Sequence, residues 1–227
     1  NENGTIDSQV SANADAGFSI VSYTGNGTSG ATIGHGLSSA PEMVIVKSRS
    51  NVEYWFVQHS TLGATKYMVL QETGASGTST TIWNDTAPTN SVFSVGGSTG
   101  VNQSAYTYIA YCFHSVEGYS KVGSYTGNGS TDGTFVYTGF RPAYVMIKNA
   151  ANSSSWVMYD NKRDTYNAVG QVLYANSSGA ESDTRPRADL LSNGFKLRSA
   201  TEPNWSSSNP IIYIAFAETP FKYTNAR

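Results

Sequence analysis

Charged residues are scarce in this chain, and the scarcity excludes several classes of protein. Only 13% of the 227 residues are Asp, Glu, Lys or Arg, and 14 basic residues against 16 acidic ones leave a net charge of −2. A soluble domain usually carries about 25% charged residues. Phosphate binding needs clustered Lys and Arg and a high pI, so a chain with a pI near 5.9 is not expected to bind nucleic acid.

Cysteine and long apolar runs are scarce as well. Cys112 is the only cysteine, which rules out an internal disulfide framework and a cysteine-based zinc site. No run approaches the roughly 20 apolar residues of a membrane-spanning helix, so we expect no membrane insertion. Aromatic residues make up 12% of the chain, with 15 Tyr, and 22 residues are Gly. Because disordered chains usually combine few aromatics with high net charge, this composition predicts a folded protein.

An internal repeat organises the sequence. Blocks of similar residues recur in the same order at an offset of about 100 residues, which is the mark of a duplicated unit. The matching blocks are 22–27 with 124–129, 43–47 with 144–148, 54–57 with 155–158, 92–95 with 194–197 and 108–111 with 213–216. We therefore expect two copies, at residues 17–117 and 118–227, preceded at residues 1–16 by a linker from a longer polypeptide.

Each copy has the pattern of short strands. In the first copy, segments rich in Val, Ile, Tyr, Phe, Trp and Thr alternate with Gly, Asn, Ser and Pro clusters. These segments are 18–24, 42–48, 54–59, 66–72, 79–83, 91–95 and 105–113. Asn26-Gly27 and Asn128-Gly129 predict hairpin turns, because both residue types tolerate positive φ. The pattern predicts an all-β fold of two tandem, internally repeated β-sandwich domains of jelly-roll type.

Motifs for enzymatic chemistry are weak. Residues 25–30 match the dinucleotide fingerprint in form, but no helix is expected after them and the second copy lacks the third glycine. His35, His59 and His114 lack the spacing of metal ligands or of a catalytic triad, so we expect local hydrogen bonds for them. No pair of carboxylates stands out for glycoside hydrolysis. We therefore expect a protein that is not an enzyme, with no catalytic residue, metal site or cofactor.

Residues that occur in only one copy are the better candidates for ligand contact, because shared positions more often serve the fold. Trp83 and Trp205 lie in unmatched segments beside Asn and Asp, and residues 159–164 concentrate charge in a chain that mostly avoids it. Aromatic rings stack on sugars, while amide and charged groups bind their hydroxyls. The candidate glycan-binding residues are Trp83, Asn84, Asp85, Asn204, Trp205, Tyr159, Asp160, Lys162 and Arg163. The alternatives are ordinary surface tryptophans and intrachain salt bridges.

Several segments resemble an uncharacterised C-terminal domain of structural virion proteins from tailed phages, many of them marine. They are residues 22–27, 34–37, 139–145, 159–164, 191–197 and 216–227. The resemblance covers nearly all of the chain from about residue 16 onward. It implies a module of a tail-fibre-like or other structural polypeptide on the surface of the phage particle, and it implies no catalytic residue.

This resemblance leads to three hypotheses about function. The first is a non-enzymatic receptor-binding domain at the tip of a fibre, which binds a host cell-surface glycan and gains avidity from a homo-oligomer, with a trimer expected. The second is a structural or decoration domain of the tail or capsid, whose partners are other virion proteins. The third is a depolymerase of surface polysaccharide, for which no acid and base pair is visible.

Overall fold

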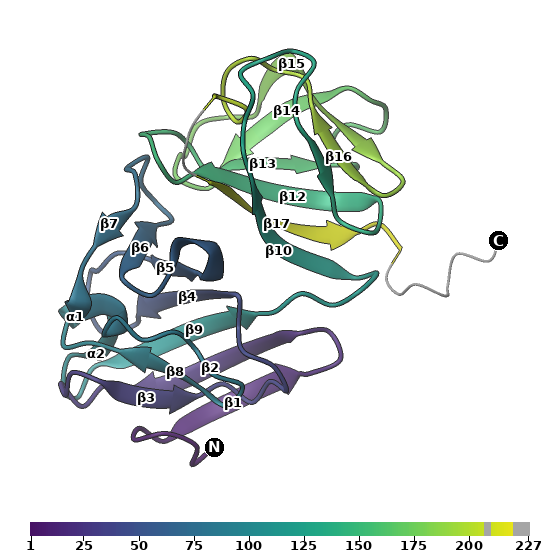
Figure 1. The fold of residues 1–227 in the computed structure, drawn as a ribbon. Helices are drawn as coiled ribbons and strands as arrows, with labels where there is room; N and C mark the ends of the chain where they lie inside the picture. The colour runs from purple at the N-terminus through teal and green to yellow at the C-terminus, as the bar shows by residue number, and fades with distance from the viewer. Residues whose placement is uncertain (207–209, 220–227) are drawn as a thin grey trace. The chain divides into compact units, whose positions relative to one another are not determined.

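The chain forms two compact units, drawn in Figure 1. The computed structural model describes residues 1–206 and 210–219. Unit 1 comprises residues 1–71 and 76–114, and unit 2 comprises residues 72–75 and 115–227. The division falls between His114 and Ser115, near the boundary expected after residue 117. The last part of the phage-like ending, residues 220–227, lies outside the described residues.

Unit 1 is built on a seven-stranded antiparallel sheet with the strand order β1-β2-β9-β4-β5-β6-β7. The strands are β1 (Ser8–Asn13), β2 (Phe18–Thr24), β4 (Met43–Ser48), β5 (Phe56–His59), β6 (Lys66–Val69), β7 (Gly77–Thr78) and β9 (Thr107–Phe113). A separate antiparallel pair is formed by β3 (Ala31–Gly34) and β8 (Val92–Val95). The connections carry three short helices, η1 (Ser60–Leu62), α1 (Thr80–Trp83) and α2 (Thr99–Asn102).

The core of unit 1 lies between the large sheet and the β3–β8 pair. The ring of Tyr23 on β2 stacks on that of Tyr108 on β9, with centroids 5.2 Å apart. It also meets the ring of Phe93 on β8 edge-on at 6.1 Å. Along β2 and β9 every second residue is buried, as expected for strands with one face on a core. Unit 1 is therefore a sandwich of two unequal layers.

Unit 2 is built on one continuous eight-stranded antiparallel sheet, with the order β10-β17-β12-β13-β14-β15-β16-β11. The strands are β10 (Ser120–Tyr125), β11 (Phe135–Tyr137), β12 (Pro142–Asn149), β13 (Val157–Asp160), β14 (Val169–Tyr174), β15 (Ser182–Leu191), β16 (Gly194–Leu197) and β17 (Ile211–Ala217). Phe195 on β16 contacts the ring of Tyr125 on β10 at 6.1 Å and that of Tyr213 on β17 at 5.4 Å. The sheet therefore folds over so that its two ends face each other across the core.

The all-β, sandwich-like fold class predicted from the sequence is confirmed, but one predicted strand is wrong. In the segment 79–83, Thr80–Trp83 form the helical turn α1 instead. The Ser79 hydroxyl accepts a hydrogen bond from the backbone N–H of Thr81 at 3.2 Å, and this cap favours a helix start over an extended strand. No helix in the described residues is long and apolar enough to cross a membrane.

The expected linker at residues 1–16 is part of unit 1. Its residues Ser8–Asn13 form β1, which pairs along its whole length with β2. Ile6 is buried in the core, and the backbone N–H groups of Thr5 and Ile6 both donate to the carbonyl of Thr32 at 3.0 Å. The strand was not predicted because its residues are mostly small and polar and do not alternate between apolar and polar types, as a half-buried strand usually does.

The hairpin prediction for the two Asn-Gly pairs is also wrong. Strand β2 pairs with β1 and β9, not with the following strand β3. The loop after β2 therefore passes from one layer of the sandwich to the other. Gly27 and Gly129 do adopt positive φ, at 72° and 63°, so these loops need glycine for a reason other than a hairpin.

Candidate functional site

Trp83 is a core residue and offers no surface to a ligand. It has 0% of its surface exposed and packs in the hydrophobic cluster of unit 1. Asn84 ends α1 in the left-handed conformation (φ 53°), and its backbone N–H donates to the Thr80 carbonyl at 2.9 Å. Of the three neighbouring candidates only Asp85 is exposed. The structure thus corrects the first half of the predicted glycan site.

Asn204 is fully buried as well, and its side chain holds a loop. Its carboxamide nitrogen donates to Asn128 Oδ1 and to the Ser130 carbonyl, both at 2.8 Å, and to the Ser199 carbonyl at 2.9 Å. Its Oδ1 accepts from the backbone N–H of Asn128 at 3.3 Å. With its polar atoms occupied in this way, Asn204 positions the loop that follows β10 and has no free group for a sugar.

The neighbouring candidate Trp205 is half-buried. A Cβ atom added to Gly127 would collide with the backbone of Asn204 and Trp205, so the two segments pack backbone against backbone. Trp205 therefore lies beside the loop clamp made by Asn204. It keeps some exposed surface.

Tyr159 is the third aromatic candidate that the structure places in a core. It is buried in the hydrophobic cluster of unit 2. Burial is the main reason that the pKa of its hydroxyl is raised above the usual range, against the opposing effect of Arg187. A side chain inside the core cannot stack on a sugar, so Tyr159 is also withdrawn from the site.

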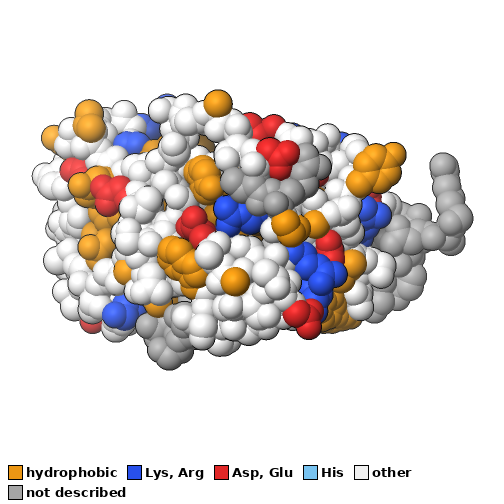
Figure 2. Space-filling model, turned by 90° about the horizontal axis from the view of Figure 1, so that it is seen from above, with side chains coloured by type: hydrophobic (Ala, Val, Ile, Leu, Met, Phe, Trp, Pro, Cys, Tyr) orange, Lys and Arg blue, Asp and Glu red, His pale blue; other side chains and the backbone are white. Residues whose placement is uncertain are grey.

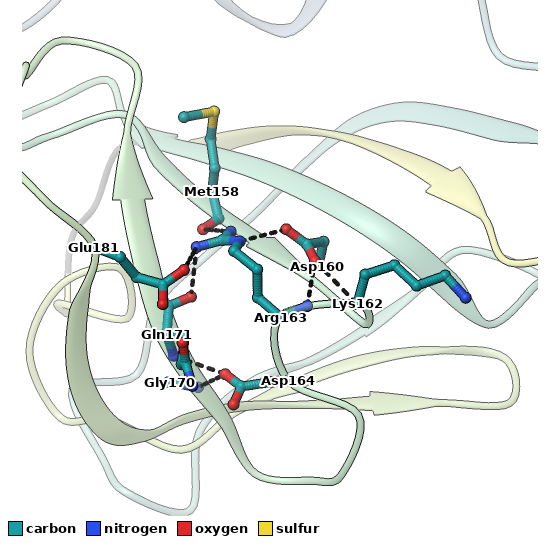
Figure 3. A network of polar contacts seen from close by, with 8 residues as sticks. All are labelled: Met158, Asp160, Lys162, Arg163, Asp164, Gly170, Gln171 and Glu181. Carbon is teal, nitrogen blue, oxygen red and sulfur yellow. Dashed lines mark hydrogen bonds and ion pairs between the residues drawn. The ribbon is translucent and has the colours of Figure 1, made fainter.

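The charged loop after Tyr159 is a structural network, shown in Figure 3. Arg163 Nε donates to Asp160 Oδ2 at 2.6 Å, and Arg163 Nη1 pairs with Glu181 Oε2 at 3.0 Å. The same guanidinium donates to the carbonyls of Gln171 and Met158 at 3.2 and 3.1 Å. Because this guanidinium bridges three segments of unit 2, the salt-bridge alternative describes Arg163 better than the ligand-binding one.

Asp160 is equally engaged in this network. Its Oδ1 accepts from the backbone N–H groups of Lys162 and Arg163, both at 2.9 Å. Burial acts to raise the pKa of Asp160, but the hydrogen bonds from Arg163 and Lys162 outweigh it and lower the pKa. Figure 3 shows the Lys162 side chain directed away from the network. Lys162 and Asp85 are the exposed members of the predicted set.

Two exposed aromatic rings lie on one strand of unit 2, the edge strand β11, whereas Tyr54 and Tyr166 are exposed singly in other segments. Phe135 is 43% exposed and Tyr137 is 66% exposed, while Val136 between them is buried. Side chains alternate across a strand, so the two rings lie on the same outer face. We call this pair the β11 platform. Figure 2 shows hydrophobic side chains in small separate patches on the face that it draws, and single exposed aromatics are ordinary there. The β11 platform differs from such single residues because it places two exposed rings on one face of one strand.

A hollow of about 430 Å³ adjoins the platform. Tyr137 lines it together with Glu117, Lys121 and Gly139. A second hollow of about 270 Å³ shares Gly139 with the first and contains Arg141, whose Nε lies 3.3 Å from Glu218 Oε2. The site thus combines an aromatic surface with charged groups of both signs, and all of these residues belong to unit 2.

In unit 1 the corresponding strand has no aromatic platform. Ile33 pairs with Phe93 in unit 1 as Val136 pairs with Phe195 in unit 2, so Thr32 and Gly34 stand where unit 2 has Phe135 and Tyr137. The N-terminal residues Thr5 and Ile6 bond to Thr32, whereas β11 is the last strand of its sheet in the described chain. Unit 2 therefore carries two aromatic rings on β11, whereas the corresponding strand of unit 1 has small residues at these positions and is hydrogen-bonded by the N-terminal residues.

The sequence contained a signal for this platform that was missed. Phe135-Val136-Tyr137 alternates around a buried valine, and neither ring has an aromatic counterpart in the other copy. Applying the single-copy criterion to these residues would have selected them. Attention to tryptophan selected Trp83 and Trp205 instead, although large aromatic residues are more often buried than exposed.

Two other groups bear on the chemistry of the surface. Cys112 is buried, and burial raises the pKa of its thiol to about 12, so the thiol stays protonated. Within the described residues, no group of three or more His, Cys, Asp or Glu side chains is placed to hold a metal ion.

These features define an all-β protein of two sandwich-like units with an aromatic platform on the second. The chain belongs to the family described as a domain of unknown function (DUF7483), whose model matches residues 1–220. No curated protein and no solved structure matches it.

Proposed function

We propose that this protein is a non-enzymatic module on the surface of a phage particle, and that the β11 platform binds a glycan of the host cell. The observation that carries the proposal is the exposure of Phe135 and Tyr137 side by side on one face of β11. The resemblance of the chain to virion proteins supports the location on a phage fibre. The host glycan is the partner that such a location implies.

The chemistry of the platform suits a sugar. The faces of pyranose rings carry C–H groups that pack on aromatic rings, and their hydroxyls need hydrogen-bonding partners around the contact. Glu117 and Lys121 line the hollow beside Tyr137, where they can accept from and donate to hydroxyls. Because a shallow contact of this kind binds weakly, we expect a homo-oligomer, a trimer in our proposal, to raise the avidity of the particle.

The test is retention of the purified protein on host cells and on their extracted surface polysaccharide. Tyr137→Ala removes an exposed ring and should weaken retention by about tenfold to a hundredfold, the worth of burying one aromatic side chain. The melting temperature should not change. Tyr166→Ala is the matched control, because Tyr166 is 85% exposed in the same unit and is not among the residues lining the two hollows.

Other results would favour the other functions. Equal retention of both variants would contradict the platform as the binding site. Failure to bind any host glycan, together with defects in particle assembly, would favour a structural or decoration domain that binds virion proteins. Shortening of the polysaccharide, abolished by a single carboxylate-to-amide change, would identify a depolymerase.

A further inference from the structure

Strand β1 is an open edge of the seven-stranded sheet of unit 1. It is the first strand in the sheet order and pairs only with β2 (Figure 1). An edge strand presents a row of N–H and C=O groups that can pair with a strand of another chain, and proteins usually protect such an edge by shortness, charge, proline or a covering segment. β1 is six residues long and contains no charged residue and no proline. Neither its length nor its composition protects it.

The hydrogen bonds of Ser8 show which backbone groups of β1 face away from β2. Its N–H donates to the Asn1 carbonyl at 3.0 Å, and its carbonyl accepts from the Asn1 amino group at 2.7 Å. Along an antiparallel strand, residues that bond to one side alternate with residues that bond to the other, so Val10 and Ala12 face the same side as Ser8. Within the part of the chain that the structure describes, no group bonds to the N–H or C=O of these two residues. The open edge therefore consists of these four groups.

The other edges of the two sheets are short or covered. β7 in unit 1 has two residues, and β11 in unit 2 has three. β10 is longer, but the segment before it lies along its edge. The Val122 N–H donates to Ser115 Oγ at 3.0 Å, and the Ser120 N–H donates to the Val116 carbonyl at 2.9 Å. Among the described strands, β1 is therefore the longest edge that is left uncovered.

A second copy of β1 satisfies all four groups in one antiparallel register. With Ser11 opposite Ser11 of the second copy, Val10 of each chain lies opposite Ala12 of the other, and each of these two pairs exchanges two hydrogen bonds. A pairing centred on Val10 would instead set Ala12 against Ser8, whose groups are already bonded to Asn1. A pairing centred on Ala12 would set Val10 beyond the end of the other strand. The edge is thus complementary to itself about Ser11.

The side chains of β1 permit this register. Ser11 is small and exposed, and the exposed Gln9 would lie opposite the exposed Asn13 of the second copy. Like charges directly opposite each other destabilise a strand pair. The nearest charged residues, Asp7 and Asp15, lie beyond the two ends of the strand. The ladder itself therefore sets no charge against its own copy.

We propose that β1 pairs with β1 of a second copy of this chain, in an antiparallel ladder centred on Ser11. This inference does not rest on glycan binding. Stable interfaces bury about 1,200–2,000 Å², and four hydrogen bonds along a short edge bury less, so the contact should be weak in solution and should strengthen where copies are held close together on a particle. Because the contact is two-fold, it would join copies from different trimers and would not build the trimer proposed above.

Cysteine cross-linking of the full chain tests the register. Ser11→Cys sets two thiols opposite each other in a pair that is not hydrogen-bonded, where the Cα atoms lie about 4.5 Å apart, within the range of a disulfide. We expect a covalent dimer on mild oxidation, and none from Ser39→Cys, an exposed position outside β1. A mixture of Gln9→Cys and Asn13→Cys should also cross-link, whereas each variant alone should not. Equal cross-linking of Ser11→Cys and Ser39→Cys, or of Gln9→Cys alone, would overturn the proposal.

Sedimentation equilibrium over a range of concentrations tests the contact itself, as a doubling of the mass of the starting species. Ala12→Pro removes one outward N–H from each copy and leaves the bonds between β1 and β2 in place, so self-association should weaken by about tenfold. Ser11→Lys sets like charges opposite each other and should weaken it by about twofold to fivefold. The exposed Ser39→Lys is the matched control, and the melting temperatures should show that all three variants are folded.

Two results would contradict the second copy as the occupant of this edge. One is the absence of any mass doubling at the highest concentration that stays in solution. The other is self-association that Ala12→Pro and Ser11→Lys leave unchanged. Binding of a different virion protein by the natural chain, lost in Ala12→Pro and without self-association, would assign the same edge to that protein and would also overturn the proposal.

Discussion

Asn102 holds Asn26 through both atoms of its carboxamide. Its Oδ1 accepts from the Asn26 backbone N–H at 2.9 Å, and its Nδ2 donates to Asn26 Oδ1 at 3.3 Å and to the Thr28 carbonyl at 2.8 Å. In unit 2 Asn204 bonds to Asn128 and Ser130 in the same way. The repeated Gly-Asn-Gly segment is thus a loop docked on a buried asparagine in each unit.

The loop clamp predicts a large loss of stability from Asn102→Ala. The variant removes three partly buried hydrogen bonds, so the free energy of unfolding should fall by about 1–3 kcal/mol. Denaturant unfolding followed by tryptophan fluorescence measures the change. Asn90→Ala is the control, because Asn90 is exposed in the same unit. Equal stability of the two variants would show that the clamp contributes nothing.

Gly127 precedes Asn128 in the loop of unit 2, and it is required because the backbone of another segment approaches it closely. The variant Gly127→Ala tests this requirement. A Cβ atom there would overlap the backbone of Asn204 and Trp205, which cannot yield as a flexible side chain can. We expect a loss of about 3 kcal/mol in the free energy of unfolding. Gly74→Ala should be neutral, because no atom lies within 4 Å of the added methyl. Calorimetry of both variants decides the matter.

Much of the fold could be predicted from the sequence, because the composition and spacing of the apolar segments indicate strands. Six of the seven segments expected in the first copy contain a strand, including 18–24 with its bounds unchanged. The strand prediction for 79–83 was wrong because the Ser79 side chain caps the start of a helical turn there. The strand β1 was missed because most of its residues are small and polar. In both cases hydrogen bonds, which composition does not record, determined the conformation.

The candidate site could be predicted far less well. Trp83, Tyr159 and Asn204 have residue types that suit sugar binding, yet tertiary packing buries all three. Exposure depends on which residues the second layer of the sandwich covers, and a single sequence does not report that. The pairing of β17 with β12 illustrates the difficulty. In the structure Ala215 lies opposite Val145, just as Cys112 lies opposite Val44. Cys112 therefore corresponds to Ala215. The match of 108–111 with 213–216 had implied Ala217, which is two residues further along the chain.

His35 makes the stability of unit 1 sensitive to acid. The Leu37 N–H donates to its Nδ1 at 3.1 Å, so the proton is on Nε2, which lies 3.1 Å from the Thr89 carbonyl. Burial lowers the pKa of His35, with His114 acting in the same direction and the Thr89 hydrogen bond against it. The unfolded chain therefore binds the proton more readily, and stability should fall as pH drops below about 6.5.

Melting temperatures between pH 8 and pH 5 test this dependence. His35→Asn keeps an oxygen near the position of Nδ1 and removes the titrating group. The variant should be less stable than the natural protein at pH 8 but should lose less on acidification. Parallel pH profiles for the two proteins would exclude His35 as the source of the acid sensitivity.

The Asp160–Arg163 network predicts that stability and ligand binding separate in this loop. Arg163→Lys keeps the charge, but an ammonium cannot reach Asp160, Glu181 and the Met158 carbonyl together. We expect the free energy of unfolding to fall by about 2 kcal/mol. Retention on host glycan should persist at temperatures where the variant is folded. Lys162→Ala, which changes the exposed neighbour, should alter neither property.

The pH profile of the same variant gives a second readout. The hydrogen bonds from Arg163 and Lys162 hold the pKa of Asp160 below its ordinary value despite burial. Their contribution to stability is therefore present above about pH 4 and is lost as the pH falls further. In Arg163→Lys the guanidinium part of that contribution is absent, so its unfolding free energy should depend less on pH between 4 and 2. Loss of glycan retention by Lys162→Ala at full stability would instead return this loop to the binding site.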